Sequence, residues 1–204
     1  MLIAMRRGTA GAVIAVGAVL ALAGGCGSSG SATSSRSSDS SPAALSAEAQ
    51  SAASGDIPDN QVFVTFHDAT AGYSMQYPEG WVQAGSGADV TLRDKNNLVH
   101  IVVRNGGAPT ARGATLELEG QRRSTPSLQV AAPRTVTVGG APVLKVAYST
   151  ESPPNAVTGR RVRLLVDRYV VPGRRRYALV DLGTPTGVDN VDAYRMMIGS
   201  FRWR

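Results

Sequence analysis

The sequence predicts an α+β domain in which a central antiparallel β-sheet carries flanking helices, as an α/β/α sandwich. Short runs of aromatic and β-branched residues are separated by glycine- and proline-rich turns, and such tight turns join antiparallel neighbours. The elements follow the order strands, helix, strands, helix. Because helices do not alternate with strands, a doubly wound parallel sheet is disfavoured. The folded domain is predicted to span residues 59–204.

Four strands come first in this domain. Val62–Phe66 and Tyr73–Tyr77 are rich in aromatic and β-branched residues, and Pro78 and Gly80 then impose a turn that offers Trp81 to the core. The second pair of strands covers residues 90–93 and 98–104, joined by a hairpin loop at 94–97.

A helix is predicted over Ala114–Arg123. Its residues are helix formers, and Glu117 and Glu119 precede Gln121 and Arg123 at helical spacing, although Gly120 weakens it. Five more strands follow, with turns at Gly139–Gly140 and at Pro172–Gly173. They are predicted over residues 128–130, 135–138, 143–149, 161–171 and 176–182.

The chain ends in a predicted amphipathic helix, Val188–Phe201. Val191, Tyr194, Ile198 and Phe201 recur at helical spacing and form one apolar stripe. We expect this stripe to pack on the sheet.

Two signatures in this order of elements resemble the PsbP/Mog1-like superfamily, in particular its bacterial envelope lipoproteins. One is Gly72–Trp81, which reads Gly-Tyr-Ser-Met-Gln-Tyr-Pro-Glu-Gly-Trp, and the other is Ser200–Trp203 at the end of the last helix. The resemblance covers residues 60–204 and implies a central antiparallel sheet sandwiched by helices. It implies no catalytic residue, because a fold does not dictate a function. We interpret the turn before Trp81 as structural, with the tryptophan as an aromatic plug.

The first 25 residues are typical of a lipoprotein signal peptide. Arg6 and Arg7 precede an apolar run at 11–23, which is shorter than the roughly 20 residues that a spanning helix needs. Leu22–Cys26 resembles a lipobox, although its leucine stands one position further from the cysteine than usual. We expect diacylglyceryl and N-acyl chains on Cys26 to anchor the protein at the extracytoplasmic face of the cell membrane. A secretory peptide cleaved nearby and an uncleaved anchor are the alternatives.

Residues 26–58 are predicted to form a flexible tether. Up to residue 56 this segment is built mainly from Ser, Gly, Ala and Thr, with Leu45 as its one large aliphatic residue. Such a composition cannot bury enough apolar surface to order itself, and the tether would span roughly 30 Å. A short helix over Ala43–Ala53 is the alternative, on alanine propensity alone.

Composition makes most enzyme classes improbable. A single cysteine excludes an internal disulfide framework and CxxC chemistry, and only two histidines are present. A metal site built from His67, Asp68 and His100 would need two strands to bring them together, so we predict no metal and no cofactor. No serine lies in a Gly-x-Ser-x-Gly motif, and Gly139–Gly140 falls between strands rather than before a phosphate-binding helix.

Arginine supplies a basic surface late in the chain. The formal net charge is +6, and removal of residues 1–25 deletes two arginines and no acid, which leaves 19 bases against 15 acids. An ordinary solvated surface is the simpler interpretation, and nucleic acid is not expected as a partner of an exported protein. The candidate contacts to an anionic partner are Arg161, Arg163, Arg174, Arg175 and Arg176.

Together these observations predict a non-enzymatic envelope lipoprotein whose domain binds an envelope protein or a small apolar ligand. One alternative is a structural module that associates with anionic envelope polymers or lipid headgroups through its arginine-rich face. An unrecognised hydrolase is the second alternative.

Overall fold

The computed structural model describes residues 55–155 and 157–204, together with Ala43 and Ser46, which are both helical. The predicted signal peptide, Cys26 and residues 26–42 of the tether lie outside the described residues. Gly55–Pro58, at the end of the predicted tether, is described.

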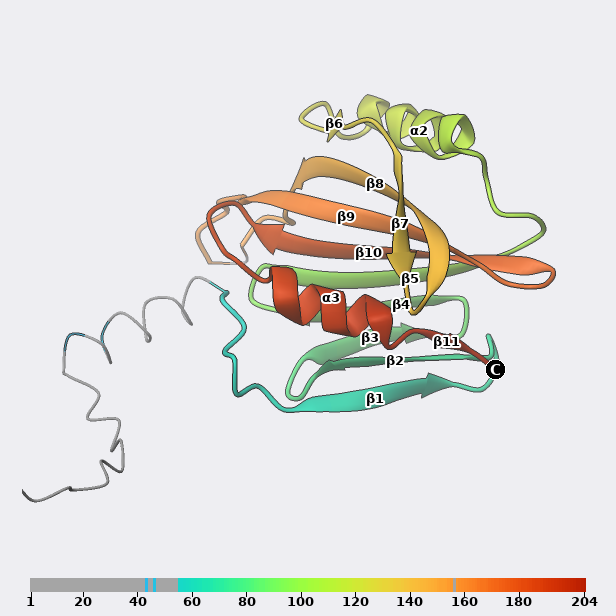
Figure 1. Ribbon diagram of the computed structural model, residues 1–204. Helices are drawn as coiled ribbons and strands as arrows, with labels where there is room; N and C mark the ends of the chain where they lie inside the picture. The colour runs from blue at the N-terminus through green and yellow to red at the C-terminus, as the bar shows by residue number, and fades with distance from the viewer. Residues whose placement is uncertain (1–42, 44–45, 47–54, 156) are drawn as a thin grey trace, which may run out of the picture. The chain divides into compact units, whose positions relative to one another are not determined.

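The strands form two antiparallel sheets (Figure 1). The small sheet has the order β1-β2-β11, and the large sheet has the order β3-β4-β5-β10-β9-β8-β6, with β7 also paired to β8. The small sheet comprises β1 (Phe63–Asp68), β2 (Tyr73–Pro78) and β11 (Arg202–Trp203). The large sheet comprises β3 (Val82–Ser86), β4 (Asp89–Asp94), β5 (Asn97–Asn105), β6 (Gln129–Val130), β7 (Arg134–Val138), β8 (Ala141–Glu151), β9 (Arg163–Pro172) and β10 (Arg176–Pro185).

The division into two sheets differs from the single central sheet that the sequence predicts. Pro78 ends β2, because a proline has no N–H to donate to a further ladder bond. Gly80 then adopts a φ of 88°, and the chain turns away to pair β3 with β4. Trp81, between the two sheets in sequence, is buried in the main core, which confirms its role as an aromatic plug.

Two α-helices lie on opposite faces of the large sheet. On β10, Ala178 and Val180 face the main core with α3 (Val191–Gly199), whereas Leu179 faces a second cluster with α2 (Ala111–Gly120). The small sheet shares the α3 side, because Tyr73 and Met75 of β2 belong to the main core. The fold is therefore α+β with mostly antiparallel sheet, as predicted.

Helix α2 begins earlier than the sequence predicts. Thr110 caps it by accepting a hydrogen bond from the Gly113 N–H at 3.2 Å. The helix ends at Gly120 and continues only as the single 3-10 turn η1 (Gln121–Arg123). Glycine weakens a helix, and here it marks the end of the regular part.

Helix α3 is shorter than predicted, at both ends. The Asp189 carboxylate accepts from the N–H of Val191, where the helix begins. Tyr194, Ile198 and Phe201 are buried as the apolar stripe predicts, but Val191 is 61% exposed. After Phe201 the chain is extended, and β11 pairs with β2. No helix within the described part of the chain is both long and apolar enough to cross a membrane.

Candidate functional site

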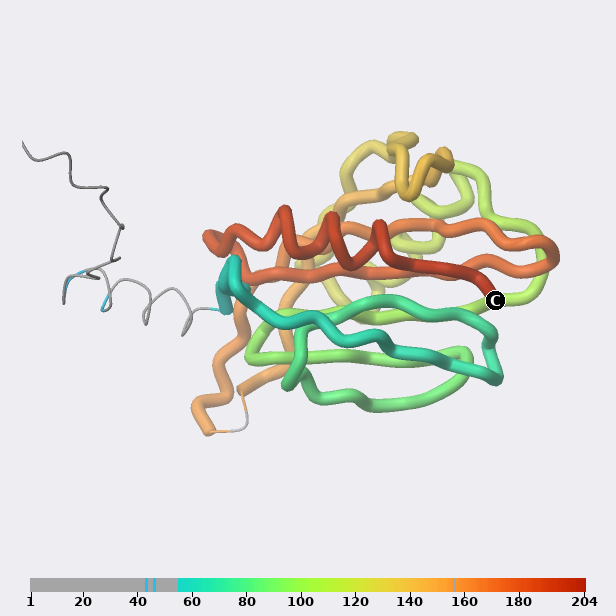
Figure 2. Tube along the Cα trace, turned by 60° about the horizontal axis from the view of Figure 1, so that its bottom comes forward, coloured from blue at the N-terminus to red at the C-terminus, as the bar shows by residue number. Residues whose placement is uncertain are grey.

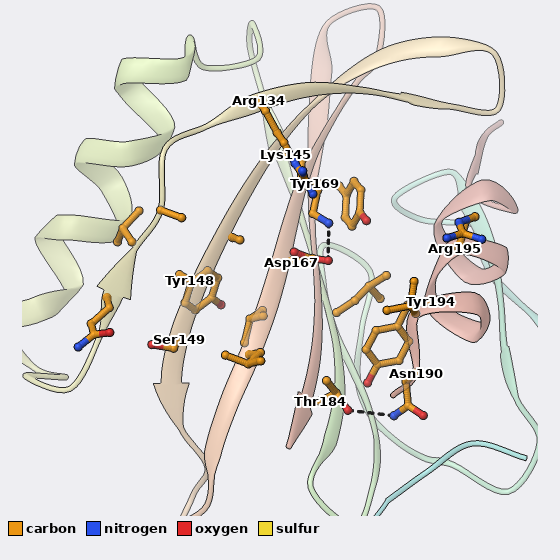
Figure 3. Close-up of a pocket in the computed structure, with 18 of the residues that line it drawn as sticks. Arg134, Lys145, Tyr148, Ser149, Asp167, Tyr169, Thr184, Asn190, Tyr194 and Arg195 are labelled. Atoms are coloured by element: carbon orange, nitrogen blue, oxygen red, sulfur yellow. Dashed lines mark hydrogen bonds and ion pairs between the residues drawn. The ribbon is translucent and has the colours of Figure 1, made fainter. Parts of the chain in front are cut away.

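A groove of about 800 Å³ lies on the α3 side of the large sheet, between α3 and β7 (Figure 3). Its floor is built from alternate residues of three neighbouring strands, since every second side chain of a strand points to the same face. These are Lys145, Ala147 and Ser149 of β8, Leu165, Asp167 and Tyr169 of β9, and Leu182 and Thr184 of β10. The volume is within the usual range for small-molecule sites.

The walls of the groove are mainly apolar. Leu165 on the floor is 49% exposed and Val191 on the α3 wall is 61% exposed, so two large aliphatic side chains stand open to solvent at this place. Leu182 and Val188 continue the apolar surface deeper between them. Exposed apolar surface gathered in a concave site is typical of ligand-binding grooves.

One end of the groove is closed by a buried asparagine at the start of α3. The Asn190 Nδ2 lies 3.0 Å from the Thr184 hydroxyl and 3.1 Å from the Gly55 carbonyl, and its Oδ1 accepts from the Ile57 N–H at 2.9 Å. Asn97 of β5 completes this network through its Oδ1. Figure 2 shows the segment that begins at Gly55 passing beside the start of α3. The predicted tether therefore joins the domain at this end of the groove.

The hydroxyl of Tyr194 is also bonded within the protein. It donates to the Gly183 carbonyl at 2.5 Å, and burial raises the pKa of Tyr194 well above its usual value. The Ser149 hydroxyl accepts from the Arg163 guanidinium at 2.7 Å, and neither histidine of the protein lines the groove. These polar atoms hold the protein together and are not arranged as a nucleophile and its base.

The other end of the groove carries charge. Lys145 and Asp167 form an ion pair with Nζ and Oδ2 2.5 Å apart, and the Lys145 side chain is only 12% exposed. The same Nζ lies 5.4 Å from the centre of the Tyr169 ring. Arg134 of β7 is the cross-strand partner of Lys145 and forms no ion pair with any described residue. On the α3 wall, by contrast, Arg195 is paired with Asp192 at 2.7 Å.

Sequence reasoning did not identify this groove. The alternation of Leu165, Asp167 and Tyr169 was readable, but the groove also needs β7, β8 and the start of α3. No local pattern fixes how these distant segments come together.

The five candidate arginines do not form one patch. Arg161 and Arg163 lie at the start of β9, while Arg174, Arg175 and Arg176 lie at its far end, in and after the turn to β10. A ten-residue strand spans about 30 Å, so the two groups are well separated. Arg161 donates to the Ser152 carbonyl at 3.0 Å and Arg163 to the Gln129 side chain at 2.9 Å.

Arg176 fixes the carboxyl-terminal end of the chain. Its guanidinium donates to the carbonyls of Ala71 at 2.6 Å, Gly72 at 3.2 Å and Arg204 at 3.0 Å. It also lies 4.6 Å from the centre of the Trp203 ring. Arg174 and Arg175 are exposed and border a hollow with Gly106 and Gly107.

The histidines and Asp68 are placed apart from one another. His67 is exposed on β1 of the small sheet, and His100 is on β5 of the large sheet, 2.9 Å from the Asp89 carboxylate. Asp68 accepts from the N–H groups of Ala71 at 2.7 Å and Gly87 at 2.6 Å. Within residues 55–155 and 157–204, the structure gathers no three His, Cys, Asp or Glu side chains that could hold a metal.

A buried ion pair on the opposite face was not foreseen either. Arg168 of β9 donates from Nε and Nη2 to the two oxygens of Asp181, each at 2.7 Å, and the Tyr148 hydroxyl donates to the same carboxylate at 2.9 Å. Glu117 of α2 stands 3.5 Å from the Arg168 Nη1. Arg168 lies in the arginine-rich late part of the sequence, but its side chain is buried beneath α2.

The architecture is that of the PsbP-like α+β fold. The solution structure of cyanobacterial PsbP (CyanoP) from Synechocystis aligns with a TM-score of 0.53 at 16% identity, over 74% of this chain and 98% of that chain. A crystal structure from Bacteroides thetaiotaomicron gives 0.44 at 14% identity, over 69% and 48% of the two chains. LpqN of Mycobacterium tuberculosis, described as involved in cell envelope biogenesis, gives 0.39 at 13%, over 70% and 91%.

No protein-family model and no curated protein matches the chain. The likeness to CyanoP, at this level of identity, establishes the fold. The function has to be argued from the groove.

Proposed function

We propose that this protein is a lipid-anchored envelope lipoprotein whose PsbP-like domain binds an apolar ligand in the groove between α3 and β7, without acting on it chemically. The observation that supports this function is the groove itself, with Leu165 exposed on its floor and Val191 exposed on its α3 wall. Burial of apolar surface is worth about 25 cal/mol per Å², so such walls favour an apolar occupant.

The internal bonding of the polar groups supports binding rather than catalysis. Thr184, Asn190 and Tyr194 each use their polar atoms on protein partners, so they add shape to the groove and no free reactive group. The position of Gly55 supports the anchored arrangement, because the tether would hold this end of the groove near the membrane from which a lipid-derived ligand could come.

Native mass spectrometry of the full chain, purified gently from its own envelope, tests this function. A ligand in the groove appears as a mass that is present in the native spectrum and absent from the denatured one, whereas acyl chains on Cys26 remain in both. Ala147→Phe, which fills the floor of the groove, should lose the additional mass, and Ala69→Phe, at an exposed turn, should keep it. A bare native mass from the unmodified chain would count against a ligand and favour a protein partner.

A second candidate function is association with anionic envelope polymers or headgroups. Arg174 and Arg175 support it, because both are exposed at a turn and form no ion pair with any described residue. This turn and Thr184 lie at opposite ends of β10. Because Asn190 bonds to both Thr184 and Gly55, the turn is also far from Gly55. Charge reversal at both arginines should weaken binding to anionic vesicles at low salt, and equal binding by the unmodified chain at all ionic strengths would exclude the idea.

A further inference from the structure

At the charged end of the groove, the positive side chains outnumber the negative ones. Arg134 and Lys145 are direct cross-strand partners on β7 and β8, and like charges in that position repel. Asp167 is the carboxylate that lies with them in the groove, and it is bonded to Lys145 at 2.5 Å. One positive charge therefore remains at this end, on Arg134.

Arg134 itself is exposed, so its side chain can reach an anionic group that enters the groove. Lys145 beside it is largely removed from solvent, and the Tyr169 ring lies next to it. The charge of Lys145 is therefore screened less by water and salt than a charge on an open surface. Burial also raises the pKa of Tyr169, and its neutral hydroxyl is a donor that can bond to an anion.

At the opposite end of the groove, the polar side chains already have hydrogen-bond partners within the protein, so the ligand does not have to supply a polar group there. Asn190, Thr184 and Tyr194 are bonded to the protein there, and the surface between the two ends is formed by side chains such as Leu165, Leu182 and Val188. Figure 3 shows Arg134 and Lys145 at one end and Thr184 and Asn190 at the other, with Tyr169 and Tyr194 between. The groove thus has a cationic end and an apolar length.

We infer that the ligand is an amphipathic anion with an alkyl chain, whose carboxylate or phosphate head is bound by Arg134 beside Lys145. Its alkyl chain lies along the apolar walls toward the start of α3. A guanidinium binds either head through two parallel hydrogen bonds, which is stronger than a neutral contact. This inference rests on the proposed function and adds the chemistry of the head group.

Isothermal titration calorimetry on the full chain carrying Cys26→Ala tests it, since no acyl chain of the protein then competes for the groove. The probes are dodecanoate, dodecyl phosphate and the neutral 1-dodecanoylglycerol. We expect at least one of the anions to bind about tenfold or more tightly than the neutral probe, and the tighter anion identifies the head group.

Three variants locate the head. Arg134→Gln should remove the preference for the anion and leave binding of the neutral probe unchanged, while Arg134→Lys should restore most of it. Asp167→Asn should tighten anion binding several-fold, because it frees Lys145. Arg112→Gln, at an exposed position of α2 on the opposite face of the large sheet, is the matched control and should change nothing.

Two different results would contradict the inference, and only one of them would also contradict the proposed function. If the neutral and anionic probes bind equally well and Arg134→Gln has no effect, the head-group assignment is wrong and the groove is still a ligand site. If no probe binds the unmodified groove, the proposed function fails together with the inference.

Discussion

At the scale of single residues, Arg168 and Asp181 show how an interior charge depends on its partner. Their side chains are 8% and 4% exposed and are joined by two hydrogen bonds of 2.7 Å. Burial by itself lowers the pKa of Arg168, but the hydrogen bonds and charge of Asp181, with smaller contributions from Tyr148 and Glu117, raise it, so the guanidinium stays charged. Such a pair is costly to break from one side.

We predict that Asp181→Asn lowers the free energy of unfolding by about 3 kcal/mol, because the buried guanidinium loses its bidentate partner and keeps only the Glu117 carboxylate at 3.5 Å. The double variant Arg168→Met with Asp181→Leu should lose much less. Urea unfolding measures both. A double variant as unstable as the single one would mean that packing, and not the uncompensated charge, is responsible.

Asp68 makes stability depend on pH. The N–H of Ala71 holds the pKa of Asp68 below its usual value of 3.8, burial opposes this, and the Gly87 N–H adds to it. The folded state therefore holds the carboxyl proton less tightly than the unfolded chain does. The stabilisation is complete above the unfolded pKa and is lost as the pH falls through the lower, folded-state pKa.

Asp68→Asn should accordingly destabilise the protein at pH 7 by about 2 kcal/mol, through weaker hydrogen bonds to Ala71 and Gly87. The difference between the two proteins should shrink as the pH is lowered below 4. Chemical denaturation at pH 7 and at pH 3 measures it. A difference that is the same at both values would show that the charge of Asp68 is not involved.

At the scale of elements, tight turns were the most readable feature of the sequence. Gly139 and Gly140 have φ values of 57° and 84°, which suit a hairpin turn, and they join β7 to β8 as predicted. Strand β3 was missed because its five residues are all exposed and include Gly85, so they carry no apolar alternation. Strand β11 was not predicted, because the sequence analysis treats Ser200–Trp203 as the end of the last helix.

The candidate site was less readable than the fold. Asn190 falls within the predicted helix Val188–Phe201 and was not singled out, yet its side chain does not cap α3 and instead bonds to Gly55, Ile57, Asn97 and Thr184. Those partners are far away in sequence. Propensity and periodicity describe neighbours along the chain and cannot show such a meeting point.

We predict that Asn190→Ala destabilises the protein by at least about 2 kcal/mol and frees the segment around Ile57 from the start of α3. Hydrogen exchange should show faster exchange at the Ile57 amide, which donates to the Asn190 Oδ1. Asp189→Ala, at the exposed neighbouring position, is the control and should leave that amide protected. Unchanged protection in Asn190→Ala would disprove the role given to this side chain.

At the scale of the whole molecule, the proposed lipid anchor can be tested separately from the folding of the domain. Two acyl chains are enough for stable membrane attachment, while one is marginal. We expect Cys26→Ala to move the protein from the membrane fraction to the medium, with the domain still folded. Fractionation followed by immunoblotting measures this, and membrane association that survives the substitution would contradict lipid attachment at Cys26.

The order of strands in the large sheet also bears on how the chain folds. β3, β4 and β5 pair with their neighbours in sequence, and so do β8, β9 and β10, but β5 pairs with β10 across the whole stretch that contains α2. Closing a long loop costs entropy before its contacts form, so the two hairpin groups can assemble early while the pairing of Asn105 with Arg176 comes late. Until that seam closes, β5 and β10 each expose an edge that can pair with another chain, so the folding chain is open to aggregation during this interval.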